Sequence, residues 1–243
     1  MNKKIKHIIS FVLVKEHYIL LSLIALVLFS GVIYSFLLGN DLRYSDENDY
    51  YTLATNLLSK HRYTLDGEHS TSFRPPGYPL FLSLFMFLGA GVVHLRILNF
   101  VAFSCCIYLL YLILKKHSSP LAGLIGASLT VCYPVLFYTA GTLYPQTFGT
   151  LLFLLILFLL PQREANATMP FFLVGLIFGY LILTIPNFIF PLLLVVLWIM
   201  FSLRTVRVKA AIVVFSVAFL VVAIWSVRHY KVFNSFVFVS TNS

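Results

Sequence analysis

Charge is scarce in this sequence, and its scarcity excludes a soluble globular domain. Only 10% of the 243 residues are Asp, Glu, Lys or Arg, against roughly 25% in soluble chains. Hydrophobic residues make up 60%, and the mean hydropathy is +0.94. Apolar runs of about 20 residues recur, and each is long enough to cross the hydrocarbon core of a bilayer as a helix. The composition therefore predicts an all-α integral membrane protein.

Cysteine is also scarce, which removes two further classes of protein. The three cysteines, Cys105, Cys106 and Cys132, all lie inside apolar runs and lack metal-ligand spacing. They are interpreted as small buried hydrophobic residues rather than as zinc ligands or a disulfide framework. The formal charge of +9 comes without a basic stripe interleaved with aromatic residues. Nucleic acid is therefore not an expected partner.

The apolar runs predict a polytopic helical bundle of about seven transmembrane helices, at residues 18–38, 94–114, 120–139, 142–160, 170–185, 187–203 and 208–227. Positively charged residues collect on cytoplasmic segments of membrane proteins. A cytoplasmic N-terminus puts ten of the 17 basic residues inside: Lys3, Lys4, Lys6, Lys15, Lys115, Lys116, Arg163, Arg204, Arg207 and Lys209. The predicted protein is thus a multi-pass component of the cytoplasmic membrane, with its first loop outside the cytoplasm.

This orientation requires that residues 78–92 do not cross the membrane. The apolar stretch there is shorter than a full span, and such stretches are more often interfacial. We expect it to form a juxtamembrane helix within an extracytoplasmic loop covering residues 39–93. A second short helix is expected over residues 49–59, because Tyr50, Leu53, Ala54, Leu57 and Leu58 recur at helical spacing.

The acidic residues gather in that one loop. Six of the eight lie between residues 40 and 74: Asp41, Asp46, Glu47, Asp49, Asp66 and Glu68. The rigid run Arg74-Pro75-Pro76-Gly77-Tyr78-Pro79 follows directly. A chain that avoids charge elsewhere and concentrates carboxylates here is expected to have its functional site here. The alternative for Asp46 and Glu47 is the ordinary stabilisation of a helix N-terminus by negative charge.

The order of residues in this loop resembles the first outer loop of GT-C glycosyltransferases, in particular the relatives of glycosyltransferase family 39. These include protein O-mannosyltransferases and the lipid A aminoarabinose transferases. The family pattern has an Asp four residues before a Tyr, an Ala four residues later, an Asn-Leu pair, and then Arg/Lys-Pro-Pro-x-Tyr-Pro. The matching residues are Asp46, Tyr50, Ala54, Asn56, Leu57, Arg74, Pro75, Pro76, Tyr78 and Pro79. Weaker similarity at Arg96, Asn99 and residues 228–242 extends the resemblance to the whole chain, as a single GT-C-like transmembrane domain over residues 1–243.

The resemblance implies an inverting transferase that takes a sugar from a polyprenyl-phosphate carrier at the outer face of the membrane. The acceptor would be a lipid, a glycan or a protein. An acceptor hydroxyl needs a base as it attacks, and Asp46 is the candidate. Arg74 and Arg96 are the candidates that contact the lipid phosphate, because guanidinium pairs with phosphate in a bidentate manner. Ordinary interfacial placement is the alternative for Arg74.

The remaining candidate substrate-binding residues are Glu47, Asp49, Tyr50, Tyr78 and Gln146. The two tyrosines either line a sugar or anchor the loop at the membrane interface. Gln146 stands where many relatives have a second acidic residue, and an amide cannot act as a base. Glu47 or Asp49 could replace that acid. A divalent metal is left open by this departure from the family pattern, and no cofactor is assigned.

The chain also ends where relatives continue, so we interpret it as an N-terminal part or a short form. A membrane-protein partner could supply the missing C-terminal part. This favours a rival hypothesis, a non-catalytic relative that binds polyprenyl-phosphate lipid or scaffolds a cell-envelope complex. A transporter is the third class considered. No predicted span has an acidic residue at mid-depth, which is unlike many ion-coupled carriers.

Overall fold

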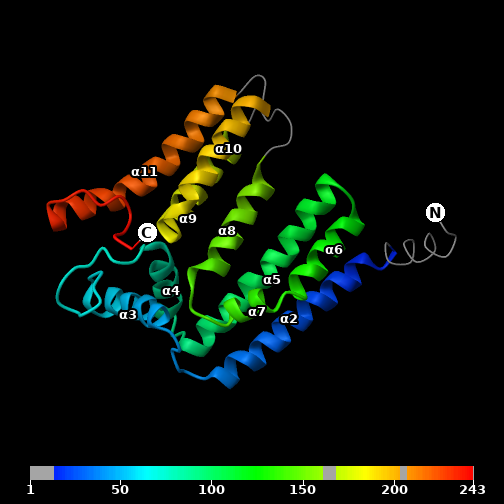
Figure 1. Cartoon of the computed structure of the whole chain (residues 1–243), viewed down its shortest axis with the longest axis horizontal. Coiled ribbons are helices and arrows are strands. Elements are labelled where there is room, and N and C mark those ends of the chain that lie inside the picture. Colours follow the sequence, from blue (N-terminus) through cyan, green and yellow to red (C-terminus); the bar gives the residue numbers. More distant parts are fainter. Residues whose placement is uncertain (1–13, 161–167, 203–206, 243) are drawn as a thin grey trace. The chain divides into compact units, whose positions relative to one another are not determined.

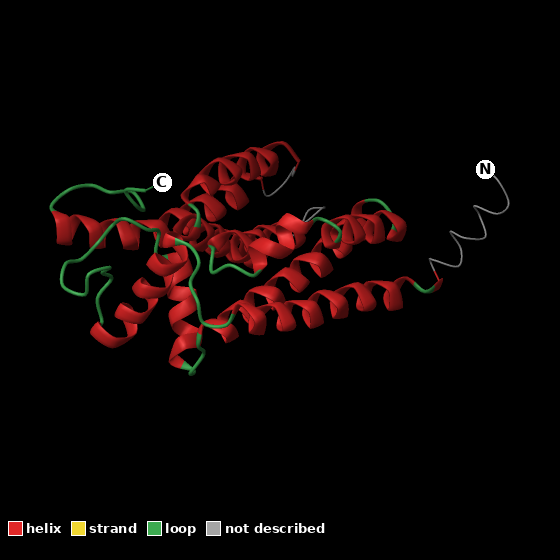
Figure 2. Cartoon of the chain, turned by 60° about the horizontal axis from the view of Figure 1, so that its bottom comes forward, coloured by secondary structure: helices red, strands yellow, loops and turns green. Residues whose placement is uncertain are grey.

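The computed structural model describes residues 14–160, 168–202 and 207–242. In these ranges the chain forms ten α-helices and one short 3-10 helix, with no strand (Figures 1 and 2). The helical class expected from the sequence is therefore confirmed. The chain divides into two compact units, Met1–Asp41 with Gly91–Leu143, and Leu42–Ala90 with Tyr144–Ser243.

The first unit contains four helices: α2 (Glu16–Leu38), α5 (Val92–His117), α6 (Pro120–Val131) and α7 (Pro134–Ala140). Helices α2, α5 and α6 pack on one another around buried residues that include Phe100, Ile107 and Ala127. The segment predicted as the span 120–139 is helical but sharply bent, since α6 and α7 meet at an angle of 67°, the geometry of a broken span or of a re-entrant loop. Pro134 is the first residue of α7, and proline has no N–H with which to continue the hydrogen bonding of α6.

The second unit contains the loop helices and the C-terminal half of the chain. Its elements are α3 (Ser45–Lys60), α4 (Gly77–Phe87), α8 (Pro145–Leu159), α9 (Met169–Thr184), η1 (Pro186–Phe188), α10 (Ile189–Ser202) and α11 (Arg207–Phe233). Both short loop helices expected from the sequence are present. Helix α3 begins at Ser45 rather than at residue 49, and its residues Tyr50, Leu53 and Ala54 are buried, as the helical spacing predicts.

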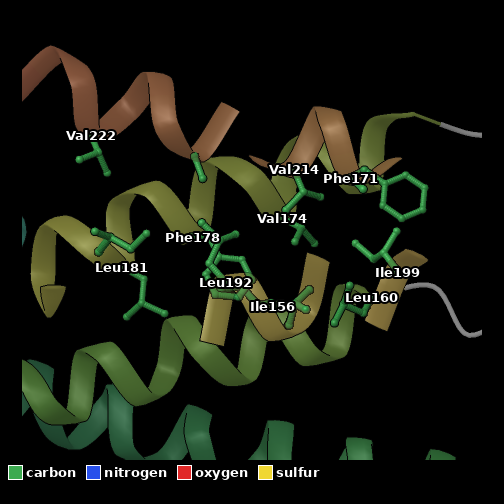
Figure 3. Packing of buried hydrophobic residues seen from close by; sticks show 14 of the residues in the cluster. Ile156, Leu160, Phe171, Val174, Phe178, Leu181, Leu192, Ile199, Val214 and Val222 are labelled. Carbon is green, nitrogen blue, oxygen red and sulfur yellow. The ribbon is translucent and has the colours of Figure 1, made fainter. Parts of the chain in front are cut away.

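Helix α9 is the centre of the second unit. Its side chains Phe171, Val174, Phe178 and Leu181 pack among residues of α8, α10 and α11 (Figure 3). Gly175 and Gly179 lie four residues apart on the side of α9 that faces α11. A β-carbon on Gly179 would come within 2.9 Å of the Ala218 carbonyl oxygen. This small-residue pair allows the close helix approach common in membrane proteins.

Three of the described helices, α2, α5 and α11, are long and apolar enough to cross a membrane, and there are four such elements if the bent pair α6–α7 counts as one span. A multi-pass membrane protein is therefore plausible from length and composition. Helices α4, α8, α9 and the segment Pro186–Ser202 are apolar but shorter. The basic residues 3–6, 163 and 204 used for the predicted orientation lie outside the described residues.

The expectation of buried cysteines is wrong for two of the three residues. Cys106 is buried, but Cys105 and Cys132 are exposed on the surface of their unit. The apolar surroundings in the sequence did not distinguish a core position from one that would face lipid, since both environments favour the same residue types.

Candidate active site

The start of α3 places two acidic side chains in different surroundings. Asp46 and Glu47 both lie in the first turn. Glu47 is fully buried, and its Oε2 accepts a hydrogen bond of 2.8 Å from the backbone N–H of Arg43. Glu47 therefore stabilises the entry to the helix. Asp46 is 42% exposed at its side chain and is directed to a different partner.

That partner is Arg74, which joins two carboxylates of α3. Its Nη2 donates to Asp46 Oδ1 at 2.5 Å and to Asp49 Oδ2 at 2.8 Å, and its Nε donates to the same Asp49 oxygen at 3.1 Å. Asp46 and Asp49 are one helical turn apart, so both point to the same side of α3. We call Asp46, Asp49 and Arg74 the carboxylate–arginine cluster, and its formal charge is −1.

Arg74 is held from several sides. Only 8% of the residue is exposed, and its guanidinium lies over the rings of Phe73 and Tyr50, at 4.8 and 5.4 Å from the ring centres. Burial acts to lower the pKa of Arg74, but its hydrogen bonds to Asp49 and Asp46 outweigh burial and raise the pKa. The guanidinium is therefore a fixed positive charge.

The backbone at Arg74 is fixed by Tyr63. The hydroxyl of this buried tyrosine is 3.0 Å from the carbonyl oxygens of both Arg74 and Pro75, to which it donates. Burial raises the pKa of Tyr63 well above its ordinary value, so the hydroxyl keeps its proton. Pro75 and Pro76 limit the backbone further. The arginine is consequently presented to α3 from a rigid segment.

Helix α4 is anchored directly behind this segment. The Tyr180 hydroxyl on α9 donates to the Gly77 carbonyl oxygen at 2.8 Å. A β-carbon on Gly77 would lie 2.7 Å from the backbone nitrogen of Thr184. Only glycine permits this approach of α4 to α9. The loop that bears Arg74 is therefore attached to the core of its unit.

The two candidate tyrosines of the loop pack together. Tyr50 and Tyr78 meet edge to face with ring centres 5.4 Å apart, and they are 6% and 0% exposed. Tyr78 also lies close to the rings of Phe81 and Phe148. Tyr50 forms the surface against which Arg74 lies, while Tyr78 is part of the packing beneath it.

Arg96, the second candidate for phosphate contact, belongs to the other unit. It is fully buried, and its guanidinium donates to the carbonyl oxygens of Gly39 and Asp41 at 2.6 and 2.5 Å. One turn further along α5, the Asn99 side chain donates to the Thr142 carbonyl oxygen at 2.7 Å. Arg96 and Asn99 thus both bind backbone carbonyl groups at turns of the chain.

Gln146 is exposed in the first turn of α8. Its neighbour Tyr144, which the sequence analysis did not identify, interacts electrostatically with Asp46 and Glu47. Burial raises the pKa of Tyr144, and the charges of Asp46 and Glu47 add to this effect. Its ring also lies 6.0 Å from that of Tyr44, the residue before α3. The one sequence signal for Tyr144 is its place immediately before Pro145.

Arg228 and Tyr63 are further polar residues near the loop. Arg228 donates to the Thr71 carbonyl oxygen at 3.2 Å and lies over the ring of Trp225 at 4.8 Å. Trp225 in turn meets Tyr63 edge to face. The sequence indicated Arg228 only through the weaker family similarity over residues 228–242 and did not indicate Tyr63. Neither partner could be read from the pattern, because the contacts join segments far apart in the chain.

The described part of the chain has no group of three or more His, Cys, Asp or Glu side chains that could hold a metal ion. Two of the loop carboxylates are moreover directed to Arg74. The donor set does not fit a divalent cation, so no chemical step is assigned to one.

No family model matches this chain, and its comparison with curated proteins and with solved structures finds no significant match.

Proposed function

We propose that this chain is a membrane glycosyltransferase that moves a sugar from a polyprenyl-phosphate carrier to an acceptor at the outer membrane face. The observation that supports this best is the carboxylate–arginine cluster, which pairs a fixed cation with two carboxylates. Two of its three residues, Asp46 and Arg74, are among those on which the resemblance to GT-C enzymes rests. The identity of the acceptor, whether lipid, glycan or protein, stays open.

The proposed membrane arrangement has seven spans. Helices α8, α9 and α10 are added to the longer helices and the bent pair, with the N-terminus in the cytoplasm. Helix α9 has 16 residues, or about 24 Å at 1.5 Å per residue, so it is about 6 Å shorter than a hydrocarbon core of about 30 Å. Helix α4, with 11 residues, is too short to cross and remains juxtamembrane together with α3.

In the proposed reaction Asp46 acts as general base. The acceptor oxygen attacks the anomeric carbon while its proton passes to the Asp46 carboxylate. The bond between the anomeric carbon and the phosphate oxygen breaks, and the lipid phosphate leaves with the electron pair. Asp46 suits this role better than Glu47, since Glu47 is fully buried and serves the entry to α3.

Arg74 would compensate the charge of the leaving phosphate. In the present structure its Nη2 is shared between Asp46 and Asp49. A phosphate at Arg74 would compete with Asp46 for that nitrogen, while the Nε contact to Asp49 could persist. Arrival of the donor would thus release the Asp46 carboxylate from its ion pair. Arg96 would then support backbone rather than contact phosphate.

A non-catalytic lipid-binding or scaffolding protein is the second candidate. The full engagement of Arg74 by two aspartates favours it, because a structural ion-pair cluster has the same appearance. The exposed amide of Gln146, where an acid was expected, also favours it. In this case a partner protein would supply any chemistry.

Sugar transfer by the purified chain in lipid nanodiscs distinguishes the two candidates. Radiolabelled polyprenyl-phosphate sugars would be offered to the unchanged chain, to Asp46→Asn, and to Glu68→Gln as a matched control on the same loop. We expect donor binding in all three and a loss of turnover of at least about 100-fold in Asp46→Asn only.

Equal turnover in Asp46→Asn would remove Asp46 from the mechanism. Donor binding without turnover in all three proteins would favour the lipid-binding candidate over the enzyme. Absence of donor binding in every protein would contradict both the enzyme and the lipid-binding protein and leave only a scaffolding role.

A further inference from the structure

The end of the described chain turns back along the last turns of α11. Asn234, at φ 49°, has the left-handed backbone that begins this reversal. Three side chains of α11 hydrogen-bond to carbonyl oxygens of the returning segment: Trp225 Nε1 to Val239 at 3.1 Å, Ser226 Oγ to Phe238 at 2.6 Å, and His229 Nδ1 to Val237 at 3.2 Å. The segment is therefore a fixed wall beside the helix.

A cavity of about 360 Å³ lies between this wall and α11, lined on one side by Phe236 and Phe238. A second cavity of about 240 Å³ adjoins α10 and the middle of α11. The two have Phe219, Val222 and Phe238 in common. The two cavities are therefore neighbours, and we refer to them together as the C-terminal groove.

The C-terminal groove is apolar along its length and basic at one end. Lys231 is the only charged residue among those that line it. Of the polar lining residues, Ser226 already donates to the wall, and Tyr230 lies next to Lys231. Cavities lined in this way do not retain water. The chemistry of the groove therefore suits a hydrocarbon chain with a negative group at one end.

The length of the groove suits one extended hydrocarbon chain. Sixteen residues separate its lining residues Phe215 and Lys231, which is about 24 Å along the helix axis.

The C-terminal groove does not include the carboxylate–arginine cluster, because none of Asp46, Asp49 and Arg74 is among its lining residues. Its occupant therefore need not be the donor lipid.

We propose that the C-terminal groove binds one acyl chain of an anionic phospholipid, with the Lys231 ammonium contacting the phosphate. Basic residues at the membrane surface attract anionic lipids, and the end of α11 passes there into the polar residues Asn234 and Ser235. Such a bound lipid would cover the apolar interval between α11 and the returning segment.

Lipid retention tests this proposal. The chain would be purified from nanodiscs that contain phosphatidylglycerol and phosphatidylcholine in equal amounts, and the retained lipid would be counted by native mass spectrometry. Val227→Trp fills the groove from an exposed position, and Ile224→Trp places the same side chain on an exposed position outside it. Lys231→Gln removes the basic end, with Lys60→Gln as its control.

We expect one retained phosphatidylglycerol in the unchanged chain and in both controls. Val227→Trp should lose it, and Lys231→Gln should lower the preference over phosphatidylcholine about fivefold, the effect of one basic group near the surface. Equal retention in Val227→Trp and Ile224→Trp would overturn the site. Displacement of the lipid by equimolar polyprenyl phosphate would overturn the choice of occupant. None of these outcomes depends on sugar transfer.

Discussion

The two units each bury an arginine, but they use it in opposite ways. In the first unit, Arg96 is fully buried and donates to two backbone carbonyl oxygens at the end of α2. In the second unit, Arg74 keeps 8% of its surface exposed and donates to two carboxylates of α3. One arginine holds main chain, and the other holds ionisable side chains.

The two arginines therefore differ in whether a ligand can replace their hydrogen-bond partners. Carbonyl oxygens at a chain turn are part of the fold, so the contacts of Arg96 can be lost only if the turn opens. Carboxylates on a helix surface can change partner when another anion arrives. Two buried arginines of similar appearance in the sequence therefore differ in whether a ligand can compete for them.

Of the three substitutions considered, Arg96→Met should lower the free energy of unfolding most. The variant leaves the Gly39 and Asp41 carbonyls without these charged donors, so we expect the free energy of unfolding to fall by about 3–5 kcal/mol. Chemical unfolding in detergent micelles measures it, with Lys116→Met, an exposed change on the same helix, as control. A loss below about 1 kcal/mol would show that Arg96 does not support the turn.

Replacing Arg74 with glutamine should have an intermediate effect. Asp46 and Asp49 would then face each other without the cation, and the free energy of unfolding should fall by about 1–3 kcal/mol. Adding Asp49→Asn should recover part of this loss, because it removes the repulsion between the carboxylates. A double variant no more stable than Arg74→Gln alone would mean that the cluster is not held by charge.

Replacing Tyr63 with phenylalanine should have the smallest effect. It removes the hydroxyl that donates to the Arg74 and Pro75 carbonyl oxygens, at a cost of about 1 kcal/mol. Amide hydrogen exchange should then quicken at residues 71–74 and remain unchanged in α5. Tyr51→Phe, at a position where the hydroxyl is outside this contact, is the matched control. Unchanged exchange in Tyr63→Phe would show that the prolines alone fix Arg74.

The helices could be predicted from the sequence more fully than the site. The predicted spans 18–38 and 94–114 lie within α2 and α5 to a few residues, because long apolar runs have few alternatives in a membrane. The break before Pro134 follows from proline chemistry. Helix α11 continues to Phe233, six residues past the prediction, since Arg228 and Lys231 made the end appear polar.

The site could be located from the sequence, but its contacts could not. The concentration of acidic residues indicated the loop, and the spacing of Tyr50, Leu53 and Ala54 indicated α3. The partners of Arg74 lie 25 and 28 residues earlier in the chain, a separation for which no periodicity gives a signal. The same applies to Tyr144, whose place near Asp46 depends on how α8 packs within its unit.

The close approach of α4 to α9 at Gly77 couples the position of the loop to that of α9. Because no side chain can be added there without moving α9, a sliding or tilting of α9 would also displace α4 and, with it, the Pro75–Pro76 segment. A movement within the core of this unit would then reach Arg74 without any ligand bound at the loop.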